Sequence, residues 1–180
     1  MSIGKDIYQL AERFFPICRS LTGSGNRKTL KIIREEIPIV VHEVKTGTQA
    51  FDWEVPREWV IRDAFVLDEN NKKVIDFKNN NLHVMGYSIP VNKIVSREEL
   101  EKHIFTIEDK PTAIPYVTSY YEDRWGFCLS YNDKKKLKGD KFRVVIDSEL
   151  VDGSLSYGEL VIPGESSSEI FISTYICHPS

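Results

Sequence analysis

The segment over residues 170–177 constrains the fold of this 180-residue chain more than any other feature. Its sequence, Ile-Phe-Ile-Ser-Thr-Tyr-Ile-Cys, is almost continuously apolar or β-branched, which is typical of a strand buried on both faces of a sheet. Such a strand needs neighbouring strands and covering helices, yet the sequence stops at Ser180. Because natural proteins avoid open apolar edges, we expect either that the natural protein continues or that another chain completes the sheet.

Helices are predicted at three places before this strand. An apolar stripe at helical spacing predicts the first helix, and it consists of Ile7, Leu10, Ala11, Phe14 and Phe15. A second helix is predicted over residues 26–36, just before Pro38. Ser96 and Glu99 have the spacing of a capping box, which predicts a short helix that ends near Phe105.

Short β-branched or alternating segments predict the strands. They cover residues 39–44, 59–67, 73–77, 82–87, 142–150 and 157–162. The turn-forming residues 68–71 join the second and third of these segments as a hairpin. The two ends of the chain mix helix and strand, whereas the middle is rich in strands. We therefore predict an α/β fold, with a mixed-sheet core from residues 1–50 and 155–180 and an inserted β-rich subdomain from residues 51–154.

Composition excludes several classes of partner. Hydrophobic residues make up 41% and charged residues 28%, as in soluble globular proteins. The net charge of −3 gives no basic surface for nucleic acid, and no apolar run is long enough to span a membrane. The N-terminus lacks the pattern of a signal peptide, and three widely spaced cysteines indicate reduced thiols. We therefore expect a cytoplasmic protein that binds neither nucleic acid nor membrane.

His178 is the candidate metal ligand. It follows the predicted central strand directly, and α/β sheets place their ligands at the carboxyl ends of strands. Imidazole is a good zinc ligand, but one histidine cannot hold the metal alone. The other ligands would have to come from later strands and loops.

Several stretches of the chain are similar to one known family. They are residues 18–23 (CRSLTG), 51–56 (FDWEVP), 114–121 (IPYVTSYY), 124–128 (RWGFC) and 177–180 (CHPS). They carry the closer resemblance, to a bacterial group of aminopeptidase-like proteins that have an inserted domain. Residues 158–164 (GELVIPG) and 169–180 (EIFISTYICHPS) resemble a region of the wider zinc aminopeptidase family, which includes bacterial leucyl aminopeptidase and relatives of glutamate carboxypeptidase. His178-Pro179-Ser180 departs from the usual His-x-Asp-Ser context of that family.

The resemblance implies that the α/β core is the incomplete, N-terminal part of a zinc-peptidase-like core. In the complete protein, two zinc ions would share a bridging carboxylate and activate a water, with a glutamate as general base. The water would attack a peptide or related amide beside a free N-terminus. Of these parts only the first zinc ligand maps onto the chain, at His178, and no catalytic residue does. We expect the isolated chain to bind zinc weakly or not at all and to be inactive.

The aromatic residues of the middle segment leave other functions open. Aromatic rings and arginine are good recognition groups, so a substrate-binding surface is predicted from Tyr120, Tyr121, Arg124 and Trp125. The alternative is that these rings fill the core of the inserted subdomain. A non-catalytic module that binds a glycan or a protein is the second hypothesis for function. A third is a subunit whose sheet is completed by a partner chain, as in an oligomer.

Overall fold

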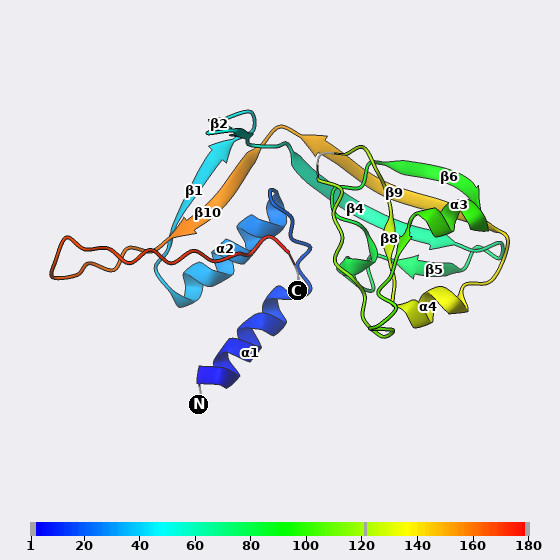
Figure 1. Cartoon of the computed structure of the whole chain (residues 1–180), viewed down its shortest axis with the longest axis horizontal. Coiled ribbons are helices and arrows are strands. Elements are labelled where there is room, and N and C mark those ends of the chain that lie inside the picture. The colour runs from blue at the N-terminus through cyan, green and yellow to red at the C-terminus, as the bar shows by residue number, and fades with distance from the viewer. Residues whose placement is uncertain (1–2, 121, 179–180) are drawn as a thin grey trace. The chain divides into compact units, whose positions relative to one another are not determined.

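The structure, a computed structural model, describes residues 3–120 and 122–178, which form two compact units (Figure 1). Unit 1 contains residues 3–58 and 151–178, and unit 2 contains residues 59–150. In chain order, unit 2 is therefore inserted between the two segments of unit 1. No helix among the described residues is long and apolar enough to cross a membrane.

Unit 1 is built on a pair of antiparallel strands and a helix. Strand β1 (Val40–Lys45) pairs with β10 (Ser154–Glu159), and the short strands β2 (Gln49–Ala50) and β3 (Trp53–Glu54) form a hairpin. Helix α2 (Ser24–Glu36) contacts β10. Its Leu30 is buried together with Ile39, which precedes β1. This α/β layer is small, and only a few apolar side chains are fully enclosed in it.

Helix α1 (Ile3–Phe14) forms as its apolar stripe predicts, but the described residues cover the stripe only in part, at the half-buried Leu10 and Phe14. Ile3 is 78% exposed and Ile7 is 63% exposed. Arg13 of α1 forms ion pairs with Glu35 and Glu36 of α2, at 2.7 and 3.1 Å. Such exposed pairs contribute little to stability.

Unit 2 contains a four-stranded sheet with the order β5-β4-β9-β6. Its strands are β4 (Glu58–Leu67), β5 (Lys73–Asp76), β6 (Val91–Ser96) and β9 (Lys141–Val151). Alternate residues of β9 are buried, including Phe142 and Val144, so one face of the sheet forms the core. Ala64 and Val66 of β4 are fully buried as well.

Shorter elements cover this core. They are the 3-10 helix η1 (Asn81–His83), helices α3 (Arg97–Lys102) and α4 (Tyr131–Lys136), and the parallel strands β7 (Ile104–Phe105) and β8 (Phe127–Cys128). The chain as a whole is therefore a mixed α/β protein with small sheets, which agrees with the α/β class predicted from its sequence.

Three local predictions are wrong. Residues 82–87 form no strand, because the end of η1 and isolated bridges at Val84 and Gly86 take their place. Helix α3 ends at Lys102, and β7 begins at Ile104. Residues 170–177 have no regular secondary structure. No described strand hydrogen-bonds to them, and the side chains of residues 170–175 are exposed. The mixed sheet predicted for the core is not formed by the described residues of unit 1 either, because its strand pairs are antiparallel.

Candidate functional site

The loop over residues 17–23 is held tightly against the first turn of α2. A Cβ on Gly25 would lie 1.9 Å from the Cys18 carbonyl oxygen, so only glycine permits this close approach. The Asn26 side-chain amide donates to the Leu21 carbonyl at 3.1 Å. The conformation of the loop is therefore fixed by contacts with the helix that follows it.

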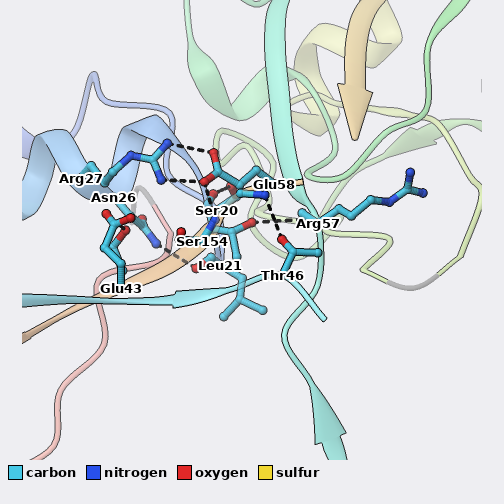
Figure 2. A network of polar contacts seen from close by, with 12 residues as sticks. Ser20, Leu21, Asn26, Arg27, Glu43, Thr46, Arg57, Glu58 and Ser154 are labelled. Atoms are coloured by element: carbon cyan, nitrogen blue, oxygen red, sulfur yellow. Dashed lines mark hydrogen bonds and ion pairs between the residues drawn. The ribbon is translucent and has the colours of Figure 1, made fainter. Parts of the chain in front are cut away.

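A partly buried ion pair anchors α2 to the point where β10 begins (Figure 2). The Arg27 guanidinium donates to both carboxylate oxygens of Glu58, at 2.6 and 2.8 Å. The Ser154 N–H donates to the same carboxylate at 2.8 Å. The hydrogen bonds from Arg27 are the main reason that the pKa of Glu58 lies below its usual value, against the opposing effect of burial.

The turn before β10 completes this network. Thr46 and Gly153 exchange two hydrogen bonds, from the Thr46 N–H at 2.9 Å and to the Thr46 hydroxyl at 3.0 Å. A Cβ on Gly153 would lie 2.3 Å from a Glu58 carboxylate oxygen, so this position leaves room only for glycine. The Glu58 carboxylate and the Thr46 hydroxyl are thus held by hydrogen bonds from the surrounding chain, which is typical of a structural scaffold rather than a reactive centre.

His178 lies where the exposed C-terminal segment returns to the body of unit 1. Residues 159–175 are exposed, whereas residues 176–178 are half-buried. The His178 ring lies 5.4 Å from the ring of Tyr175. Within the described residues there is no group of three histidine, cysteine or acidic side chains that could hold a metal ion. The chain thus offers one imidazole of the predicted zinc site.

Arg19 lies in the loop over residues 17–23 and is a residue that the sequence analysis did not single out. It is only 8% exposed, its guanidinium lies 5.7 Å from the centre of the Phe14 ring, and its Nε has no hydrogen-bond partner. Burial lowers the pKa of Arg19, and the nearby Cys177 partly opposes this effect. Arg19 and Cys177, far apart in the sequence, therefore lie near each other. The sequence contains one indication that Arg19 is unusual, because it is the single charged residue between Arg13 and Arg27.

Burial makes the other two cysteines poor nucleophiles. Burial raises the pKa of Cys18 to about 11 and that of Cys128 to about 12. Neither thiol is then ionised at neutral pH, and a thiol rather than a thiolate is a poor nucleophile.

The predicted aromatic surface of unit 2 divides between interior and solvent. Trp125 is 7% exposed and its ring stacks on His103 at 3.5 Å. Tyr120 is half-buried and stacks on Tyr87 at 5.7 Å. Arg124 is exposed and forms an ion pair with Glu122 at 2.8 Å.

The fourth residue of that predicted surface, Tyr121, lies outside the described residues. Tyr87 and Tyr120 both have positive φ angles, 61° and 54°, which bulky residues rarely adopt. The substrate-binding role of the four residues stays a prediction.

Comparison with known families places the chain. Residues 58–149 match the model of a family described as a domain of unknown function (DUF2172). The match takes in about half of the chain and coincides closely with unit 2. The chain therefore belongs to this family.

Two longer proteins are similar to almost all of the chain. One, from Clostridium acetobutylicum, is 55% identical over 177 residues and is provisionally named a polysaccharide biosynthesis protein with an aminopeptidase-like domain. The match covers 98% of this chain and 41% of that protein. The other is a crystal structure from the same organism, provisionally named a peptidase. It matches with a TM-score of 0.92 and 55% identity, over 98% of this chain and 42% of that one.

The chain thus spans about two fifths of the length of these relatives and has the fold of the matching part. Their names agree with the peptidase-like class that the sequence resemblance implied, at the level of an aminopeptidase-like protein.

Proposed function

We propose that this chain is the N-terminal part of a zinc-dependent aminopeptidase-like hydrolase and that it is inactive by itself. The observation that carries the proposal is the 55% identity, over 98% of the chain, to a solved protein named as a peptidase. Because the chain covers 42% of that protein, most of the catalytic machinery would belong to the remaining part. The substrate would be a peptide or related amide with a free amino end.

One residue of this chain is suited to be a ligand in a zinc site. The His178 imidazole is a suitable donor, and its half-buried position beside Tyr175 limits its orientations. Zinc would supply Lewis acidity and a water of lowered pKa. The second and third protein ligands and the general base would come from the rest of the full-length protein. A cytoplasmic location suits the free thiols of Cys18, Cys128 and Cys177.

The first prediction concerns the metal. The full-length protein is expected to contain zinc and to hydrolyse leucine p-nitroanilide. His178→Ala should remove zinc and lower kcat/KM by more than about 100-fold, since loss of a direct ligand exceeds the effect of a supporting residue. Metal analysis and steady-state kinetics measure both quantities.

A histidine elsewhere in unit 1 provides the control. His42 pairs with Glu159 at 3.1 Å and has no part in the proposal, so His42→Ala should keep zinc and activity. The isolated 180-residue chain should bind zinc weakly. Tight, stoichiometric zinc in that chain, or full activity of the His178 variant, would contradict the proposed function.

A second candidate is a carbohydrate-binding module in unit 2. Two observations favour it. The half-buried Tyr120, with its positive φ of 54°, stacks on the buried Tyr87, and the name of the relative mentions polysaccharide biosynthesis. Aromatic rings bind the apolar faces of sugars, and strained backbone angles cluster at functional sites. Loss of oligosaccharide binding in Tyr120→Ala, with the fold retained, is the result that this candidate requires.

A further inference from the structure

Arg19 is a buried cation without a counter-charge among the described residues. It is 8% exposed, and its Nε is enclosed without a hydrogen-bond partner. The Phe14 ring at 5.7 Å offers a weak cation–π contact in place of an anion. Burying a charge without pairing it is costly, so an arginine in this state indicates an anion that binds to it.

Arg27, only eight positions further on, shows the usual solution in the same unit. Its guanidinium is paired with both oxygens of Glu58, and the Ser154 N–H completes the set. Arg19 has no such carboxylate within the described part of unit 1. Its partner is therefore expected from outside these residues.

Contacts within the loop fix the backbone on both sides of Arg19, and its side chain is buried against Phe14. Cys18 is pressed against Gly25, and Ser20 donates a 2.6 Å hydrogen bond to the Thr22 carbonyl. Ser20 and Thr22 are themselves buried. A fixed guanidinium loses little conformational entropy on binding, which is the property of a prepared recognition group.

Arg19 also lies beside the end of the segment that carries His178. In Figure 1 the last part of the red segment runs next to the blue stretch that follows α1, and the influence of Cys177 on the pKa of Arg19 agrees with this proximity. Cys177 precedes His178 directly in the sequence. An anion bound to Arg19 would therefore lie next to the proposed metal ligand.

We infer that Arg19 binds a carboxylate of the substrate at this peptidase-like site and makes the enzyme favour substrates with a carboxylate near the cleaved amide. The inference rests on the proposed function. The planar guanidinium matches a carboxylate with two parallel hydrogen bonds, and carboxylates are the anionic groups of a peptide. A dipeptide places its terminal carboxylate close to its single amide bond.

The test compares Leu-Gly with Leu-Gly amide, which differ in that carboxylate alone, on the full-length protein. The wild type should prefer Leu-Gly. Arg19→Gln should lower kcat/KM for Leu-Gly by about 10- to 100-fold, mainly through KM, because a charge-assisted pair is lost. Hydrolysis of the amide should change by less than about threefold, and Arg19→Lys should recover part of the preference. The control is Arg34→Gln on the exposed side of α2, which should change neither substrate.

Binding to metal-free protein separates this inference from the proposed function. Leu-Gly and its amide are titrated calorimetrically into wild type and the two Arg19 variants, with zinc content measured in parallel. Preference for Leu-Gly that depends on Arg19 supports the inference, whether or not zinc is present. If the protein contains zinc but does not prefer Leu-Gly over its amide, the inference about Arg19 is wrong and the proposed function stands.

If Arg19→Gln does not fold, the inference can still be tested. The preference for Leu-Gly over its amide is then compared between the wild type and Arg19→Lys. An equal loss on both substrates in Arg19→Gln would overturn the inference. So would a lower melting temperature with unchanged selectivity, because Arg19 would then be paired with an acidic residue of the remaining protein.

Discussion

At the scale of single residues, unit 1 contains two arginines in opposite states. Arg27 is bound to the buried Glu58, which also accepts the Ser154 N–H, whereas Arg19 is buried without a carboxylate in the described residues. A satisfied buried pair stabilises local geometry, because removing one partner leaves an uncompensated charge. A buried arginine without a carboxylate partner is instead suited to bind an anionic ligand. The two positions therefore call for different experiments.

Glu58 carries a pH dependence of known sign. Its pKa is lowered from an ordinary value of 4.5, chiefly by hydrogen bonds from Arg27, so its stabilising effect is present above 4.5. That effect is lost as the pH falls through the lower folded-state pKa. Glu58→Gln should lower the opening free energy of unit 1 by about 2–3 kcal/mol at neutral pH. The loss is limited because Arg27 is 36% exposed, so water can solvate its charge in the variant. The variant should also show a weaker loss of stability as the pH falls.

Hydrogen exchange of the β10 amides, measured between about pH 3 and pH 7, reports this opening free energy in unit 1. The control is Glu36→Gln, since Glu36 also pairs with an arginine but is 54% exposed. It should change little. An acid dependence that is the same in Glu58→Gln as in wild type would assign the effect to other carboxylates.

At the scale of elements, the sequence predicts those whose signals are local. The apolar spacing of α1, the Ser96 cap of α3 and the turn between β4 and β5 all act within a few residues, and each appears in the structure. Residues 170–177 fail for the opposite reason. A strand exists only with hydrogen-bonded neighbours, and the described residues supply none.

The capping box of α3 forms only in part, and this gives a prediction. The Ser96 hydroxyl accepts the Glu99 N–H at 3.2 Å, but the Glu99 carboxylate binds His103 instead of returning to Ser96. Ser96→Ala should therefore cost about 1 kcal/mol, the usual value of an N-cap. Urea unfolding followed by the fluorescence of the buried Trp59 and Trp125 measures it in unit 2.

The matched variant at this position is Ser96→Asp, because aspartate caps helices as well as serine does. It should retain wild-type stability, since Ser96 itself is exposed and makes room for the longer side chain. If the alanine and aspartate variants lose the same free energy of unfolding, the Ser96 hydroxyl stabilises the end of strand β6 rather than the N-terminus of α3.

At the scale of the whole molecule, the two residues of the proposed site differ in how they came to be candidates, and the role of His178 stays a prediction. His178 follows a strand-like segment, and strand ends are where α/β proteins place ligands. Arg19 became a candidate only through its burial and its approach to Cys177, which depend on tertiary structure. No local pattern in a sequence states that a charge is left without a partner.

The exposed apolar segment before His178 gives the last prediction. Phe171 is 90% exposed and Tyr175 is 63% exposed, whereas Phe127 and Phe142 are buried. Chymotrypsin should cut the 180-residue chain first after Phe171 and Tyr175, because cleavage requires accessible, locally unfolded backbone. Phe127 and Phe142 serve as internal controls that should stay intact. In the full-length Clostridium acetobutylicum relative, the equivalent segment should be protected, since its apolar pattern is that of a strand buried in a sheet. Mass spectrometry of timed digests compares the two. Equal cleavage of the segment in both proteins would show that the remaining three fifths of the relative do not cover it.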